Sequence, residues 1–211
     1  MKNILNINKP KGPTSFDIVA QVRRRTGVKK VGHAGTLDPL ASGVLVVAVG
    51  REATKTISEV VAKEKEYVAD IKLGAVSNTD DEEGAKTVIG DYQPSREEIA
   101  EAINSFIGEI KQVPPQFSAI KVAGRPAYKT ARQGRKLELP ARPVAIKEIE
   151  LLEYEYPNLK IRVVCGPGVY IRSLARDLGQ VLKTGAYMSD LVRTRVGEYK
   201  IENAVGVEDL D

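Results

Sequence analysis

Apolar side chains recur along the chain in two patterns that predict β-strands. Residues 44–49 are the longest apolar run, and a run this short and rich in valine favours a buried strand over a helix. Residues 67–73 alternate instead, with Tyr67 and Ile71 on the apolar face, which predicts a half-buried strand. Further strands are expected at residues 3–7, 144–156 and 159–165, and the last two form a hairpin around Pro157 and Asn158.

Apolar residues spaced three or four positions apart predict three helices. The first has Ser15 as its N-cap, Phe16, Val19 and Val22 facing inward, and Gly27 as its stop. The other two follow a capping box at residues 95–98 and a glycine-containing turn before residue 171, with apolar positions at Ile99, Ala102, Ile103 and Phe106, and at Leu174, Leu178, Val181 and Leu182. Helices mixed with hairpins predict an α+β fold, in which helices flank a mainly antiparallel mixed sheet.

Composition limits the kinds of site that the chain can hold. Its 211 residues, 42% hydrophobic and 28% charged, are enough for one globular domain with a sizeable core. The only cysteine, Cys165, cannot form an internal disulfide, and no apolar run is long enough to cross a membrane, so we expect a soluble cytoplasmic protein. One histidine and one cysteine exclude Cys/His zinc sites, and nucleotide-binding glycine motifs are absent, so we expect no metal and no cofactor.

Charge is distributed unevenly along the chain. Residues 1–33 hold eight Lys and Arg against one acid, and residues 111–147 hold nine against one. Residues 77–101 carry eight acids and two bases, and the four consecutive acids at 80–83 predict a solvated turn. Two basic blocks separated by an acidic one favour a positive surface for a polyphosphate ligand such as nucleic acid. The alternative is a set of solvated faces that do not meet in space.

Two charged residues, Asp38 and Arg172, stand at positions where the local backbone or the helix dipole makes a charge unusual. Residues 32–43, with three glycines and a proline, predict a loop, and Asp38 precedes Pro39, which keeps its backbone extended. Such an Asp is either a turn device or a fixed carboxylate at the mouth of a buried strand. Arg172 begins the last predicted helix, where the helix dipole opposes a cation. A buried carboxylate such as Asp38 would compensate that charge, whereas the alternative is an ordinary surface arginine.

Two further segments have both a functional and a structural interpretation. Residues 9–15 form a basic turn that leads into a helix N-terminus, which could hold a phosphate or be a simple loop and cap. Tyr67 begins its strand with the ring on the apolar face, so by itself it is a core tyrosine.

Together these segments resemble the TruB family of bacterial tRNA pseudouridine synthases. The family's blocks occur in its order along nearly the whole chain, from residue 9 to about 199. The most specific are G-T-L-D-P-L-A-S-G-V-L at 35–45 and Y-I-R-S-L-A-R-D-L-G at 170–179; the others include K-P-K-G-P-T-S at 9–15, Lys65-Glu66-Tyr67, and Leu191 with Arg193-Thr194.

The resemblance implies a pseudouridine synthase fold and an isomerase that acts on tRNA. Residues 1–211 would form the catalytic domain, with a basic insertion at about 111–136 that clamps RNA and without the C-terminal RNA-binding PUA domain that family members usually carry. The implied reaction converts uridine 55 in the T-loop of tRNA to pseudouridine after the nucleotide flips out. It breaks the C1′–N1 bond, joins C5 to C1′ and needs no cofactor or metal.

The resemblance also implies roles for individual residues. Asp38 would be the catalytic carboxylate, Arg172 its ion-pair partner, and Tyr67 would stack on the target base and take part in proton removal. Tyr170 and Leu191 would line the pocket, and His33 would fill the space that the flipped nucleotide leaves. The residues expected on the RNA backbone are Lys9, Arg23, Lys29, Lys30, Lys121, Arg125, Lys129 and Arg132.

Three other functions are compatible with parts of this pattern. A non-catalytic RNA-binding relative would share the charge, a guide-RNA-dependent subunit of the dyskerin type would share the motifs, and a small-molecule enzyme could use the same carboxylate as a nucleophile. The brevity of the chain and its basic insertion favour the stand-alone type, a monomer that acts on free tRNA with no obligatory protein partner.

Overall fold

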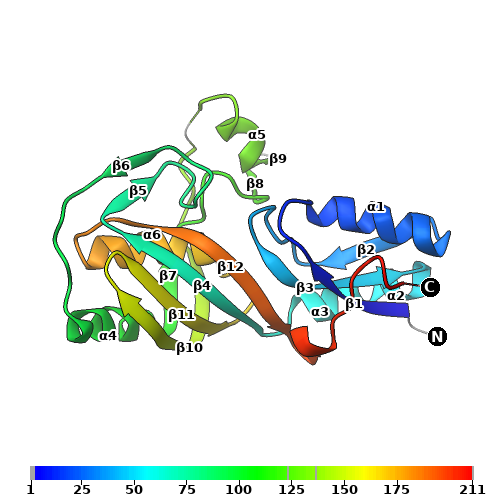
Figure 1. Ribbon diagram of the computed structural model, residues 1–211. Helices are drawn as coiled ribbons and strands as arrows, with labels where there is room; N and C mark the ends of the chain where they lie inside the picture. The colour runs from blue at the N-terminus through cyan, green and yellow to red at the C-terminus, as the bar shows by residue number, and fades with distance from the viewer. Residues whose placement is uncertain (1–2, 123, 136, 211) are drawn as a thin grey trace. The chain divides into compact units, whose positions relative to one another are not determined.

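The computed structural model describes residues 3–122, 124–135 and 137–210. The chain divides into two compact units (Figure 1). The first unit comprises Met1–Val68, Val164–Pro167 and Leu191–Asp211, and the second comprises Ala69–Val163 and Gly168–Asp190. Within the described residues, no helix is both long and apolar enough to span a membrane.

Both units contain helices as well as strands, as expected for an α+β fold. The first unit contains β1 (Asn3–Lys9), α1 (Ser15–Thr26), β2 (Val31–Ala34), β3 (Ser42–Val49), α2 (Arg51–Lys55), α3 (Ile57–Val61), β13 (Tyr199–Lys200) and the 3-10 turn η1 (Ile201–Asn203). The second contains β5 (Ala75–Ser77), β6 (Lys86–Val88), α4 (Arg96–Asn104), β7 (Gly108–Gln112), β8 (Lys121–Val122), β9 (Arg125–Pro126), α5 (Ala127–Ala131), β10 (Arg142–Glu155) and α6 (Ile171–Val181). Three strands contribute residues to both units: β4 (Lys65–Leu73), β11 (Asn158–Cys165) and β12 (Ala186–Val196).

The main sheet is mixed and mainly antiparallel, as the sequence predicts. Its strand order is β1-β3-β12-β4-β11-β10-β7, with β2 on β3 and β13 on β12. β1 and β2 run antiparallel to β3, and β7 runs antiparallel to β10, whereas β12 runs parallel to β3. The strands predicted from apolar patterns are confirmed at β1, β3, β4, β10 and β11.

The core of the first unit is built on β3. Every residue of this strand after Ser42 is buried, because β1 pairs along one edge while β2 and β12 share the other. Val44 and Val46 pack with Val60 of α3 and Val196 of β12. A strand paired on both edges and covered on its faces reads as a continuous apolar run, which is the pattern of residues 44–49.

Helix α1 differs from its prediction at the N-terminal end. The N-cap is Thr14, not Ser15: the Thr14 hydroxyl accepts from the Asp17 amide, and the Asp17 carboxylate accepts from the Thr14 amide. Phe16 was expected inward but is 71% exposed, whereas Val19 and Val22 are buried as predicted. Gly27, with φ of 66°, ends the helix as expected.

The predicted loop at residues 32–43 is shorter than expected. Residues 31–34 form β2, which pairs with residues 49–46 of β3, so only residues 35–41 remain a loop. The glycines of this segment disfavour a strand locally, and the pairing with a distant strand overrides that preference.

The second unit confirms the other two predicted helices. Helix α4 begins at a capping box in which the Ser95 hydroxyl accepts from the Glu98 amide, and it packs on β10. Helix α6 buries Leu174 and Leu178 as expected, whereas Val181 is exposed at its C-terminal end.

Gly43 is required where β3 lies against β1 and β12. Its φ is +98°, and a Cβ there would lie 2.3 Å from the carbonyl oxygen of Arg193. Gly50, at the other end of β3, has a similar φ of +91°, but a Cβ there would meet nothing within 4 Å.

We expect Gly43→Ala to lower the free energy of unfolding well beyond the loss caused by Gly50→Ala. The Gly50 variant carries only the backbone strain of a positive φ, about 1–3 kcal/mol. The Gly43 variant adds a clash with main-chain atoms that cannot move without breaking strand pairing. Urea denaturation of both variants measures the difference, and equal losses would contradict the packing argument.

Candidate active site

The loop that carries Asp38 is held on both sides of that residue. The hydroxyl of Ser15, at the start of α1, donates to the carbonyl of Leu37 at 3.0 Å and accepts from the amide of Leu37 at 2.9 Å. The amide of Gly12 donates to the carbonyl of Pro39 at 2.8 Å, and the amide of Ala41 donates to the carbonyl of Asp38 at 3.1 Å. The backbone of Asp38 is therefore fixed between two anchored neighbours.

Arg193 of β12 ties the two ends of this loop together. It is only 1% exposed, and its guanidinium donates from Nε to the carbonyl of Val44 at 2.7 Å and from Nη2 to the carbonyl of Gly35 at 3.1 Å. The sequence predicts no role for Arg193. The one available signal was its place in the Arg193-Thr194 pair that matches the family, because no local pattern marks an arginine as buried.

Lys9, the last residue of β1, is also near Asp38. Its side chain is fully buried, and Nζ donates to the carbonyls of Pro10 and Pro13, each at 2.8 Å. The pKa of Lys9 is lowered to about 8: burial is the main cause, the Asp38 carboxylate opposes it, and the charge of Arg193 adds to it. The ammonium group is thus withdrawn from the surface, and the contact of Lys9 with the RNA backbone stays a prediction.

Tyr67 and Lys65 lie on the same buried face of β4. The ammonium of Lys65 donates to the carbonyls of Val61 and Lys63, each at 2.7 Å. Burial raises the pKa of the Tyr67 hydroxyl, and the Arg193 guanidinium partly offsets that shift. The phenol is therefore protonated at neutral pH. The alternation that predicted a buried Tyr67 also marks Lys65, two residues earlier, as inward-facing.

His33 and Leu191 also belong to the first unit. His33, in β2, is half-buried, and its ring meets the ring of Phe16 edge to face, with centroids 5.3 Å apart and planes at 80°. Burial, together with the charge of Arg193, lowers the pKa of His33, so the imidazole is neutral at pH 7. Leu191, in β12, is buried.

Arg172 lies in the second unit, in the first turn of α6, and it is buried. Its Nη1 is 3.3 Å from Oδ2 of Asp81 and 3.3 Å from the carbonyl of Thr79, and its Nη2 donates to the carbonyl of Phe117 at 2.9 Å. A buried carboxylate thus compensates the cation at the helix start, as expected, and Asp81 supplies it. The predicted pairing with Asp38, a residue of the other unit, stays a prediction.

The acidic segment at 80–83 is only partly the solvated turn that the sequence predicts: Glu82 and Glu83 are exposed, whereas Asp80 and Asp81 are not. Asp81 is only 4% exposed, and Asp80 pairs with Arg176 of α6 at 2.9 Å. A run of acids is typical of a solvated face, and the arginines that pair with Asp80 and Asp81 lie about 90 residues further along the chain.

Tyr170 is the N-cap of α6. The side-chain amide of Gln112 accepts from the Tyr170 amide at 2.8 Å and donates to the Tyr170 carbonyl at 3.1 Å. This pair of bonds links β7 to the start of the helix that carries Arg172, and the Tyr170 side chain is half-buried.

The cations expected on RNA differ from Lys9 in exposure. Arg23, Lys29, Lys30, Lys129 and Arg132 are all exposed. The guanidinium of Arg132 lies 5.5 Å from the ring centre of Tyr128. The side chains of Lys121 and Arg125 lie outside the described part of the structure.

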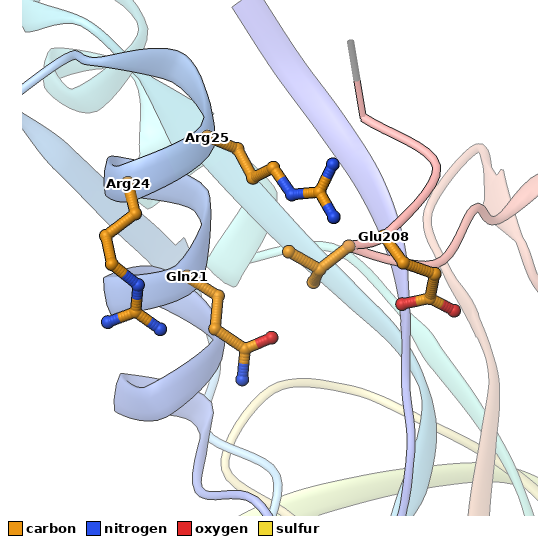
Figure 2. Close-up of a pocket in the computed structure, with 5 residues that line it drawn as sticks. Gln21, Arg24, Arg25 and Glu208 are labelled. Atoms are coloured by element: carbon orange, nitrogen blue, oxygen red, sulfur yellow. The ribbon is translucent and has the colours of Figure 1, made fainter.

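A pocket in the first unit lies between α1 and the C-terminal segment. Figure 2 shows Gln21, Arg24 and Arg25 on the helix and Glu208 on that segment; Val207 completes the lining. It is lined by none of the residues predicted for catalysis.

Comparisons with known proteins match this chain to one family of RNA-modifying enzymes. The family "TruB family pseudouridylate synthase (N terminal domain)" matches residues 23–171, and "tRNA pseudouridylate synthase B C-terminal domain" matches residues 172–211. The tRNA pseudouridine synthase B of Clostridium novyi is 46% identical over 210 residues, which cover 100% of this chain and 72% of that protein. The Bacteroides fragilis protein of the same name is 49% identical, with 96% and 89% covered.

A solved structure supports the same assignment. The chain resembles a chain in "Crystal Structure of a Cbf5-Nop10-Gar1 Complex", with a TM-score of 0.76 and 35% identity. The match covers 98% of this chain but spans only about half (53%) of that one. From its sequence, its α+β fold and these matches, the chain belongs to the TruB family of pseudouridylate synthases and is an isomerase of that class.

Proposed function

We propose that this protein converts uridine 55 in the T-loop of tRNA to pseudouridine. Relatives named tRNA pseudouridine synthase B, matched over 72% and 89% of their lengths, support tRNA as the substrate. In the reaction the C1′–N1 bond breaks and a C5–C1′ bond forms. The C5 hydrogen leaves as a proton and N1 gains one, so the nucleotide is isomerised without any other reactant.

The observation that carries this proposal is the fixed backbone of Asp38, the residue whose carboxylate we assign to catalysis. The loop is anchored at Leu37 and Pro39, on either side of Asp38. The Lys9 ammonium interacts electrostatically with the Asp38 carboxylate. A carboxylate carried on an anchored backbone needs less reorganisation during the reaction than one on a free loop. Asp38 is the catalytic group in our proposal, acting on either the sugar C1′ or the base.

Tyr67 contacts the target base as a neutral phenol. Because burial raises its pKa, Tyr67 is a poor source of phenolate at neutral pH. Its ring offers a stacking face, and its hydroxyl can exchange hydrogen bonds with the base while a proton is transferred. Of the roles that the family resemblance implies for Tyr67, we therefore propose stacking and hydrogen bonding by the neutral phenol, and not proton removal by a phenolate.

The remaining predicted residues complete the proposed substrate site. Tyr170 and Leu191 line the pocket, and Arg172 contributes its guanidinium to the Asp38 carboxylate. His33 fills the space that the flipped nucleotide leaves. Because its imidazole is neutral at pH 7, it enters a base stack without burying a charge.

We also propose that the protein acts alone in the cytoplasm, as a monomer, on free tRNA. The relatives named tRNA pseudouridine synthase B are 46–49% identical, whereas the chain in the Cbf5-Nop10-Gar1 complex is 35% identical. Formation of pseudouridine in free tRNA, with no other protein or RNA added, tests this part of the proposal.

Asp38→Asn tests the catalytic role directly. We expect it to reduce tritium release from tRNA labelled at uridine C5 by at least about 1,000-fold, because the group that acts on the reacting atoms is lost. Asp209→Asn, at an exposed acid of the same unit, serves as the control. Equal release by both variants would exclude Asp38 as the catalytic group, and a non-catalytic RNA binder would show no release even without substitution.

The pKa of Lys9 gives a prediction about pH. Between about pH 8 and 10.5 the folded protein has lost this proton while the unfolded chain still binds it, so Lys9 makes the free energy of unfolding rise over that range. Over the same range the positive charge beside Asp38 disappears, and we expect the single-turnover rate to fall.

Lys9→Met should remove both effects, whereas Lys11→Met, at an exposed lysine two residues away, should retain them. Rates and urea denaturation measured from pH 7 to 10 provide the readouts. A rate that falls in the same way in wild type and Lys9→Met would assign the titration to another group.

RNA binding should weaken steeply with salt, because the proposed contacts release counterions from phosphates. Replacing the exposed Lys29 by Ala should make the slope of log affinity against log salt shallower by about 0.7–0.9, the change for one lost phosphate contact. Lys55→Ala, at a lysine already paired with Glu52, should leave the slope unchanged. Filter binding at several salt concentrations measures both, and identical slopes would remove Lys29 from the interface.

A further inference from the structure

We propose that Phe16 is a base-stacking residue, which together with His33 binds an unpaired base of the RNA loop next to the flipped uridine. This inference rests on the proposed function and adds a substrate contact that neither the sequence motifs nor the family matches assign. Phe16 is the apolar residue of α1 that was expected to face inward and is exposed instead.

The exposure of Phe16 has no structural explanation within α1. Ile18, Val19 and Val22 bury the apolar face of the helix, whereas Phe16 is 71% exposed. Among the described residues of the first unit, it is the most exposed large hydrophobic side chain; Val61 and Val205 are 38% and 42% exposed. A single exposed ring is too small for a protein-docking surface, but one base can stack on it.

Phe16 lies within one or two residues of the anchors of the Asp38 loop. Its neighbour Ser15 holds both backbone groups of Leu37, the residue before Asp38. Its ring contacts His33 in β2, two residues before Gly35, whose carbonyl accepts from Arg193. The pair of rings is thus carried by the same rigid elements that hold the catalytic loop.

The chemistry of the pair suits a base. An edge-to-face contact with His33 leaves at least one face of the Phe16 ring uncovered by it, and every base has a face that can stack on an aromatic ring. The exposed Arg23 lies further along α1, and its Nη2 donates to the carbonyl of Val31 in β2, so a cation is held where α1 lies beside β2 (Figure 1). A ring for the base and a cation for the phosphate are the two components of single-strand recognition.

The test compares Phe16→Ala, Phe16→Leu and Phe16→Trp with wild type on a tRNA T-arm hairpin. We expect the Ala and Leu variants to raise KM by about five-fold or more with kcat unchanged, because one stacking contact is lost. Phe16→Trp, which keeps a stacking ring, should retain the wild-type KM. Tyr92→Ala, at a 51% exposed tyrosine of the second unit, is the matched control and should leave both constants unchanged.

A second substrate series identifies the base. In hairpins with an abasic site at each loop position in turn, the effect of Phe16→Ala should disappear at one position and persist at the others. If Phe16→Leu behaves as wild type, or if no abasic position removes the effect of Phe16→Ala, stacking is excluded. An active wild type with unaffected Phe16 variants overturns this inference alone, whereas a wild type that forms no pseudouridine in the hairpin or in tRNA overturns the proposed function.

Discussion

The buried guanidinium of Arg193 is the interaction on which the candidate site depends. It joins β12 to the two ends of the Asp38 loop through the carbonyls of Gly35 and Val44, and it changes the pKa values of Lys9, His33 and Tyr67. Burial of such a charge is costly unless its donors are bonded. The carbonyls bond those donors, and Gly43 lets the backbone of β12 come close enough for the guanidinium to reach them.

Several cations therefore share one small buried region around the Asp38 loop. Burial lowers the pKa of both Lys9 and Lys65, and the charge of Arg193 adds to the lowering in each case. Each ammonium donates to two main-chain carbonyls. Like charges in a low-dielectric interior repel one another. A site arranged in this way has a positive potential before its substrate arrives, which suits a ligand whose every nucleotide carries a phosphate.

Local patterns in the sequence predict the strands and helices. The proposed site residues come instead from the motifs that match the family. The run at 44–49 and the alternation at 67–73 predict β3 and β4 because each pattern reports the burial of one strand. Burial of Lys9, Arg193 and Asp81 could not be predicted, since each is stabilised by groups distant in sequence. Phe16 was misassigned because helical spacing marks a face, and a residue in the first turn can leave that face without breaking the helix.

Charge compensation within each unit separates the requirements of stability from those of catalysis. Arg172 has the carboxylate of Asp81 in its own unit, and Asp38 has Lys9 in its own. Removal of Arg172 would leave the buried carboxylate of Asp81 without this partner, so the resulting instability would arise in the second unit and not at the Asp38 loop. The stability of the first unit therefore does not depend on Arg172, and the contribution of Arg172 to Asp38 that we propose concerns catalysis alone.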